Sequence, residues 1–166
     1  NPVENPAAEP IDTMQTEYSE IYDQEPRIGE GYFYWRVRSL DEDGTPLSDW
    51  SPVVSFRNDP RDHWEIAVFG DSISHGGGHI SYSPADHEFS WLSYLDFPAI
   101  NLSMSGDTSE TMLERFEDDV LPFRPRYLLI MNGTNSLRAG ISAAEVIADL
   151  EELKRLCLAN GIRPIF

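Results

Sequence analysis

Three short polar segments of this 166-residue chain contain the residue types that nucleophilic catalysis by serine requires. They are Gly70-Asp71-Ser72, Ser105-Gly106-Asp107 and Asn132-Gly133-Thr134-Asn135. A serine hydroxyl attacks a carbonyl carbon when a base accepts its proton, and the resulting oxyanion needs hydrogen-bond donors already in place. Glycine lets the backbone approach the reacting group closely, and the asparagine side chain is a neutral donor. Asp71 is expected to hold its own turn by a side-chain hydrogen bond.

Each of the three segments follows a stretch that predicts a β-strand. Residues 65–69 form an apolar run that closes at Gly70, residues 99–102 form a weaker run, and residues 127–131 form the clearest strand of the chain. Ligands of open α/β sheets bind beyond the carboxyl ends of the strands, where loops from neighbouring strands meet. We therefore expect the three segments to lie together at one edge of a sheet.

Two amphipathic helices are predicted between these strands. Asp107 and Glu110 have the spacing of a capping box, which predicts a helix that begins near residue 107. Ser142 and Glu145 have the same spacing, and this second helix is expected to end at Asn160-Gly161. The apolar residues at helical spacing are Met112, Phe116 and Val120 in the first helix and Val146, Leu150, Leu153 and Cys157 in the second.

The order of these elements is β, loop, β, α, β, α, β, which defines an α/β fold with a doubly wound, flavodoxin-like parallel sheet. We place this domain at residues 64–166. Its last strand, at residues 162–166, has no helix after it, and a parallel sheet buries both of its faces. The domain is therefore expected to be incomplete at its C-terminus and to pair with the rest of a longer polypeptide.

The residues before this domain have the pattern of a β-hairpin. Residues 32–40 alternate between two faces, Asp43-Gly44 supplies a turn, and residues 53–56 form the second strand. A polar segment with a proline follows and ends the second strand.

The hairpin resembles the last two strands of a fibronectin type III-like domain over residues 15–57. The resemblance is carried by Tyr34-Trp35-Arg36-Val37-Arg38 and Ser48-Asp49-Trp50-Ser51-Pro52. Such sandwiches need about 100 residues and seven strands. We therefore expect a partial all-β sandwich module at residues 1–57, followed by a linker at residues 58–63.

The three polar segments resemble the first three sequence blocks of the GDSL, or SGNH, hydrolase family, over residues 64–166. By this resemblance the fold is of the SGNH-hydrolase type, Ser72 is the nucleophile, and the backbone N–H of Gly106 and the side-chain amide of Asn135 donate to the oxyanion. The family's base and acid come from a later Asp-x-x-His segment, which this sequence does not contain. These residues alone are therefore expected to be inactive. The family also has aspartate where this chain has Ser136, a difference expected to loosen the loop that holds Asn135.

Further candidates for contact with substrate are His75, Tyr82 and Trp91, which follow Ser72 in the sequence. His75 as the general base is an alternative, although nothing in the sequence would orient its ring. His75 and His79 have a spacing that binds zinc on a helix, but three glycines between them oppose a helix and no third ligand is evident. We therefore expect no metal and no cofactor.

The composition is acidic, with 29 aspartates and glutamates against 12 lysines and arginines and a net charge of -17. This charge argues against nucleic acid or an anionic membrane surface as a partner. No apolar run approaches the roughly 18 residues of a membrane span. The single cysteine, Cys157, excludes an internal disulfide, and its helical surroundings favour a buried structural thiol.

These observations lead to the hypothesis of a secreted or periplasmic serine ester hydrolase. It would act through an acyl-serine intermediate on a small-molecule or carbohydrate ester, removing short acyl groups, and this substrate is inferred from the family resemblance. Two alternatives stay open. One is a lipid or thioester hydrolase of the same family, which needs an apolar acyl channel, and the other is a non-catalytic carbohydrate-binding protein with a hydrolase-like fold.

Overall fold

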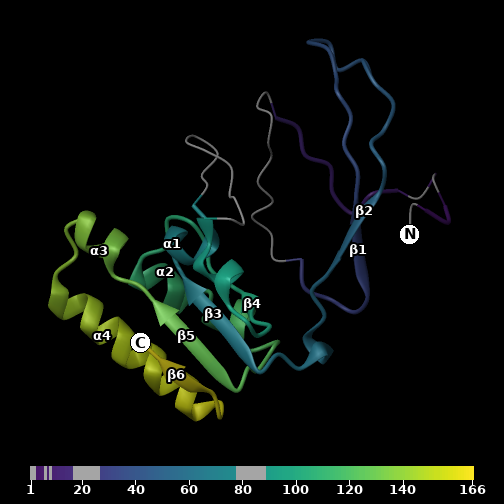
Figure 1. The fold of residues 1–166 in the computed structure, drawn as a ribbon. Coiled ribbons are helices and arrows are strands. Elements are labelled where there is room, and N and C mark those ends of the chain that lie inside the picture. Colours follow the sequence, from purple (N-terminus) through teal and green to yellow (C-terminus); the bar gives the residue numbers. More distant parts are fainter. Residues whose placement is uncertain (1–2, 6, 8, 17–26, 78–88) are drawn as a thin grey trace.

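The computed structural model of the chain describes residues 3–5, 7, 9–16, 27–77 and 89–166 (Figure 1). A two-stranded antiparallel ribbon comes first along the chain, and an α/β unit built on a four-stranded sheet follows it. The polar segments of interest all belong to the α/β unit.

The ribbon pairs β1 (Tyr32–Trp35) with β2 (Val54–Arg57). Phe33 lies opposite Phe56, and their rings stack with centroids 5.4 Å apart. The ribbon turns at Gly44, whose φ of +80° is the left-handed conformation that the predicted turn requires. The predicted hairpin is therefore confirmed.

The first strand is shorter than the sequence alternation predicted for residues 32–40. In the register of β1 and β2, Pro52 would lie opposite Val37, and proline has no N–H to donate to a ladder. The Ser51 hydroxyl instead accepts the hydrogen bond from the Val37 N–H at 3.1 Å, and the Ser51 N–H donates to the Val37 carbonyl at 2.8 Å. The pairing thus continues beyond β1 without forming a regular strand.

Large apolar side chains on the ribbon are exposed. They are Tyr32, Trp35, Val37, Leu47, Trp50, Val54 and Phe56. The guanidinium groups of Arg36 and Arg38 both lie over the Trp50 ring, 4.5 and 4.3 Å from its centroid. Within the described residues the ribbon has two strands and no second sheet packed on it, so the fibronectin type III-like module stays a prediction.

The turn between the ribbon and the α/β unit is ordered by one carboxylate. Asp59 is fully buried and caps the 3-10 turn η1 (Pro60–Asp62), where it accepts from the Arg61 N–H at 2.9 Å. It also accepts from the Gly31 N–H at 3.1 Å, and the Arg61 guanidinium at 2.7 Å lowers the pKa of Asp59. Asp59 therefore binds the start of the ribbon to the expected linker at residues 58–63.

The α/β unit contains a parallel sheet with the strand order β4-β3-β5-β6. The strands are β3 (Ile66–Gly70), β4 (Ile100–Asn101), β5 (Tyr127–Met131) and β6 (Arg163–Ile165). The chain enters at the central strand β3, places the next strand on one side, and places the last two on the other. This arrangement confirms the doubly wound α/β fold that the sequence predicted.

The core lies between the sheet and helices α2 (Ser109–Glu114) and α4 (Ala143–Ala159), which pack against each other. Ala67 and Phe69 of β3 belong to this cluster, whereas Val68 is also fully buried but lies outside it, because side chains of a strand alternate between faces. Other members of the cluster are Met112, Phe116, Val120, Leu128, Leu153 and Cys157. The apolar periodicity of both predicted helices is thereby confirmed.

Helix α4 begins and ends as predicted. Ser142 and Glu145 form a reciprocal capping box, and the helix ends at Ala159, just before Gly161 with its φ of +75°.

No helix among the described residues is long and apolar enough to cross a membrane.

Helix α2 begins later than predicted. Its N-cap is Thr108, which forms a capping box with Thr111, and a π-helical turn at Phe116–Val120 follows the helix. Asp107 is not the cap because its carboxylate binds the side chain of Arg115. A capping box predicted from residue spacing alone takes no account of Arg115, which competes for the Asp107 carboxylate.

Besides η1, three further short helical segments among the described residues were not predicted. They are α1 (Ser72–His75), the 3-10 turn η3 (Trp91–Tyr94) and α3 (Thr134–Arg138). Each is about one turn long, which is too short for an apolar period to show in the sequence.

The thiol of Cys157 is fully buried in α4, and burial raises its pKa to about 11. We expect the folded full-length protein at about pH 8 to resist a disulfide reagent such as DTNB, because the thiolate is the reactive form. The same protein unfolded in guanidinium chloride should react fully. Rapid labelling of Cys157 in the folded state would contradict the structural role assigned to this thiol.

Candidate active site

The three polar segments meet at the carboxyl edge of the sheet, as the sequence predicted. The Met104 N–H donates to the Gly70 carbonyl at 2.9 Å, which brings the second segment to the first. Gly70 also lies opposite Met131 in the register of β3 and β5, so the third segment starts beside the first. The Asn135 side-chain amide donates to the Asp107 carbonyl at 2.9 Å, which joins the third segment to the second.

Ser72 is the first residue of α1 and follows β3 after a single residue. That residue, Asp71, is buried and caps the helix, accepting from the Ile73 N–H at 3.0 Å. The helix ends after one turn at Gly76, whose φ is +112°. Ser72 is therefore held half-exposed at the edge of the sheet, and the expected structural role of Asp71 is confirmed.

Gly70 has to be glycine for β3 to lie beside β5 at this point. A Cβ atom there would be 2.9 Å from the Met131 carbonyl oxygen and 2.8 Å from the Ser74 hydroxyl. The Ser74 side chain is fully buried and accepts a hydrogen bond from the indole N–H of Trp91 at 3.0 Å. The half-buried Trp91, predicted to contact substrate, thus uses its polar group to hold α1, the helix that begins with Ser72.

Gly106 has a φ of +94°, a conformation that side chains rarely adopt. It is exposed, and apart from its two chain neighbours no described residue has a heavy atom within 4 Å of the place where its Cβ would be. Its two neighbours are both bound to other elements, Ser105 through His75 and Asp107 through Arg115. The position of Gly106 is therefore set by bonds of the residues on either side of it.

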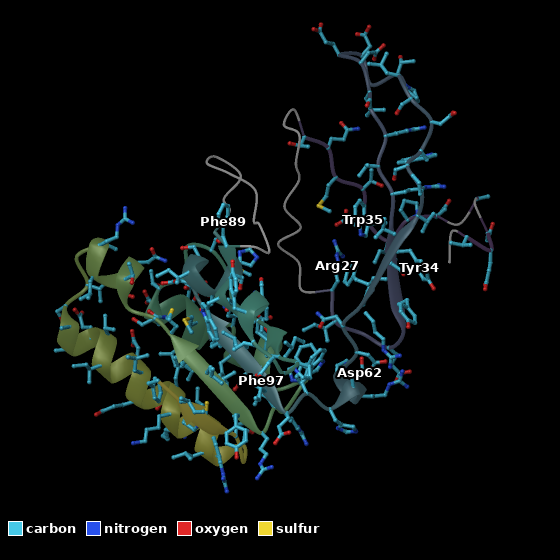
Figure 2. The ribbon with its side chains drawn as sticks, viewed as in Figure 1. Arg27, Tyr34, Trp35, Asp62, Phe89 and Phe97 are labelled. Atoms are coloured by element: carbon cyan, nitrogen blue, oxygen red, sulfur yellow. The ribbon has the colours of Figure 1, made fainter. Side chains whose placement is uncertain are left out.

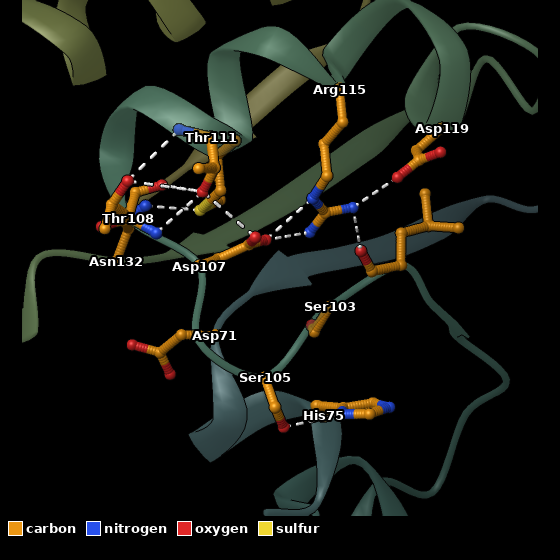
Figure 3. Close-up of polar contacts among 12 residues, drawn as sticks. Asp71, His75, Ser103, Ser105, Asp107, Thr108, Thr111, Arg115, Asp119 and Asn132 are labelled. Atoms are coloured by element: carbon orange, nitrogen blue, oxygen red, sulfur yellow. Dashed lines mark hydrogen bonds and ion pairs between the residues drawn. The ribbon is translucent and has the colours of Figure 1, made fainter. Parts of the chain in front are cut away.

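Arg115 holds both ends of the loop between β4 and α2 (Figure 3). Its guanidinium donates to the Leu102 carbonyl at 2.8 Å and binds the Asp107 carboxylate, with Nε at 2.8 Å. It also binds Asp119 at 2.6 Å and lies 4.2 Å from the centroid of the Phe69 ring. We call Arg115, Asp107, Asp119 and the Leu102 carbonyl the Arg115 network.

The Arg115 network is largely removed from water. The side chain of Arg115 is 13% exposed and that of Asp107 is 5% exposed. Burial raises the pKa of Asp107, and the positive charge of Arg115 opposes that effect. Breaking such a pair by removing one partner leaves a buried group uncompensated, so the network is expected to be important for stability.

Ser136 occupies the place where the resemblance led us to expect aspartate. It is fully buried; its hydroxyl accepts from the Ser109 N–H at 2.9 Å and donates to the Ser109 hydroxyl at 3.2 Å. Ser109 in turn donates to the carboxylate of Asp149 in α4 at 2.5 Å. A carboxylate is thus supplied from another helix, and α3 with Asn135 is held rather than loosened.

The His75 ring, predicted to contact substrate, lies against the second segment. Its Nδ1 is 2.8 Å from the Ser105 hydroxyl (Figure 3). Tyr82, the third residue predicted to contact substrate, lies outside the described residues, as does His79. Among the described residues, no group of three or more His, Cys, Asp or Glu side chains is arranged to hold a metal ion.

Sequence reasoning assigned no role to Arg115, Ser105 or Ser109. Arg115 and Asp119 have the i, i+4 spacing of a helical ion pair, so this half of the network was detectable. The partners at Asp107 and Leu102 were not, because they come from a loop whose path only the folded chain defines.

The chain matches the model of the GDSL-like lipase/acylhydrolase family over residues 68–165, and it belongs to this family. The uncharacterized lipoprotein YqeF of Bacillus subtilis is 32% identical over 81 residues, covering 45% of this chain and 33% of YqeF. The crystal structure of TesA is similar with a TM-score of 0.51 and 26% identity, covering 60% of this chain and 57% of that one.

The fold is also similar to that of the psychrotrophic esterase EstA from a Pseudoalteromonas species. The TM-score is 0.50 and the identity 24%, covering 60% of this chain and 56% of EstA. The chain therefore spans little more than half the length of the TesA and EstA structures and a third of YqeF.

Replacing Arg115 by Met should lower the free energy of unfolding by about 3–5 kcal/mol, because Asp107 and the Leu102 carbonyl lose a buried donor. Urea denaturation of the full-length protein measures the change. The matched control is Arg155→Met, since Arg155 is 62% exposed and binds Glu152 on the surface of α4. The control should change stability by less than about 1 kcal/mol. Equal losses in the two variants would contradict the importance of the network.

A second prediction concerns the pH dependence of stability. Burial lowers the pKa of His75, the charge of Arg115 lowers it further, and Asp107 acts in the opposite direction. The unfolded chain binds this proton near pH 6.5, and the folded chain binds it only at a lower pH. The neutral ring therefore makes its full contribution to the free energy of unfolding above about pH 6.5, and this contribution is lost as the pH falls below that value. Urea denaturation between about pH 7 and pH 5 should show a steeper loss for the wild type than for His75→Asn. An NMR titration midpoint of His75 at or above about 6.5 would contradict this prediction.

Proposed function

We propose that this protein is a serine ester hydrolase in which Ser72 attacks the carbonyl carbon of an ester and forms an acyl-serine intermediate. The Gly106 N–H and the Asn135 side-chain amide stabilise the oxyanion of the tetrahedral intermediate. Collapse of that intermediate releases the alcohol, and a water molecule then hydrolyses the acyl-serine.

The observation that carries the proposal is the hydrogen bond from the Asn135 amide to the Asp107 carbonyl at 2.9 Å. It brings the asparagine to the residue next to Gly106, so two donors of different kinds lie on adjoining segments. An amide group has two N–H donors, and this bond needs one of them. The meeting of these segments with the one that carries Ser72 supports a common site for nucleophile and oxyanion donors.

A serine nucleophile needs a base, and the 166 residues contain no Asp-x-x-His segment. We propose that a histidine and an aspartate outside these residues complete the site in the full-length protein. The Nδ1 atom of His75 is engaged with Ser105, so the ring already has a structural partner. A general base acts through Nε2 while Nδ1 is engaged, so the assignment of the base to a residue elsewhere rests on the family's Asp-x-x-His segment and not on this bond.

The proposed substrate is a short acyl ester of a carbohydrate, hydrolysed outside the cytoplasm. The net charge of -17 disfavours work at an anionic lipid surface. Phe89 and Tyr94 follow the nucleophile helix in the sequence and are 74% and 78% exposed, and exposed aromatic faces are typical of binding surfaces. Figure 2 shows Phe89 on the side of the unit where α1 lies, and Phe97 towards the opposite end of the sheet.

Replacing Ser72 by Ala in the full-length protein should lower kcat for p-nitrophenyl acetate by at least about 1000-fold, because the nucleophile is lost. Ser55→Ala, on the exposed strand β2, is the matched control and should leave turnover unchanged. Turnover that survives Ser72→Ala would overturn the assignment of the nucleophile.

The same assay separates the alternatives. Preference for acetyl esters and release of acetate from acetylated oligosaccharides support the proposed substrate. Preference for long acyl chains or thioesters would instead support the lipid or thioester hydrolase. Binding of oligosaccharide with no ester hydrolysis by the full-length protein would support the non-catalytic alternative.

A further inference from the structure

His75 and Ser105 join the nucleophile helix to the loop that contains Gly106. His75 is the last residue of α1, three residues after Ser72. Its Nδ1 is 2.8 Å from the Ser105 hydroxyl oxygen, and that hydroxyl is 2.6 Å from the Gly77 carbonyl. This contact therefore joins the helix that begins with Ser72 to the residue before Gly106.

The proton positions in this arrangement follow from the number of donors. A carbonyl only accepts, so the single proton of the Ser105 hydroxyl is donated to Gly77. The Ser105 oxygen then accepts from His75, which places a proton on Nδ1. A charged imidazolium also has a proton on Nδ1, so the bond does not depend on the charge of the ring.

Gly106 depends on this bond more than a packed residue would. Among the described residues, none except its two chain neighbours has a heavy atom within 4 Å of its Cβ position, so packing against other elements does not hold it in place. On one side it is held through Asp107 and the Arg115 network, and on the other through Ser105. Loss of the His75 bond would remove the side-chain contact between α1 and the residue next to Gly106, while Arg115 still holds the two ends of the loop.

We propose that His75 is a positioning residue of the site: through Ser105 it sets the backbone N–H of Gly106 relative to the helix that begins with Ser72. This inference rests on the proposed function for its effect on turnover. It does not require His75 to contact substrate or to accept the serine proton.

The expected effect of losing the bond falls on kcat. An oxyanion donor acts in the transition state, so its displacement lowers kcat and leaves KM nearly unchanged. A misplacement of about 1 Å costs up to about 100-fold. His75→Leu and Ser105→Ala should therefore each lower kcat for p-nitrophenyl acetate by about 10- to 100-fold in the full-length protein.

Two further variants test the bond itself. Asparagine carries an N–H near the position of the imidazole Nδ1, so His75→Asn should recover most of the lost kcat. The double variant His75→Leu/Ser105→Ala should lose no more than Ser105→Ala alone, because that change already removes the bond to His75 together with the bond to Gly77. His63→Asn is the control, since His63 is exposed beyond the other end of β3, and it should change nothing.

Other outcomes would overturn the proposal. A raised KM in His75→Leu points to a substrate contact, and equal, near-complete losses in His75→Leu and His75→Asn point to a general base. Losses that multiply in the double variant mean that the two residues act separately. If Ser72→Ala abolishes turnover but His75→Leu leaves kcat unchanged, the positioning role of His75 is rejected and the proposed function is kept.

A readout without turnover separates this inference from the proposed function. In the NMR spectrum of the full-length protein, the Gly106 amide signal should shift or broaden in His75→Leu and return in His75→Asn. If the protein hydrolyses no ester and this signal still responds, the bond is established and the esterase function fails. If the Gly106 signal is unaffected by His75→Leu, the positioning role is wrong whatever the activity.

Discussion

The guanidinium of Arg115 is the charge around which the carboxyl edge of the sheet is organised. It contacts the start of the β4–α2 loop at the Leu102 carbonyl and the end of the same loop at the Asp107 carboxylate. A buried cation is tolerated only when its hydrogen bonds are satisfied and its charge is balanced. Here Asp119 supplies further balance and the Phe69 ring covers one face. With both ends fixed, the loop has few ways to place Gly106.

The β4–α2 loop is also bound by Asn135 of helix α3, which follows β5. Asn135 donates to the carbonyl of Asp107, the residue whose carboxylate binds Arg115. Through Ser136 and Ser109 the short helix α3 is bound to α2 and then to Asp149 of α4. A serine in place of an aspartate thus keeps the helix in position, because the carboxylate reaches it from another element.

The sequence was informative where structure is periodic. The strands, the helix α4 with its capping box, and the doubly wound order follow from apolar spacing, which reports on burial over several residues. The beginning of α2 was misassigned because Asp107 has two possible partners, and the spacing to Glu110 does not reveal that Arg115 binds it instead. Single-turn helices such as α1 and α3 carry no periodic signal at all.

What the sequence by itself determined is therefore the family, the fold and the identity of Ser72, Gly106 and Asn135 as candidate site residues, because each stands directly after a predictable strand. Only the tertiary structure decided what holds them. The bond from His75 to Ser105 and the ion pair of Arg115 with Asp107 join elements that are far apart or irregular in the sequence. Their partners are set by the distances between packed elements, and residue spacing does not encode those distances.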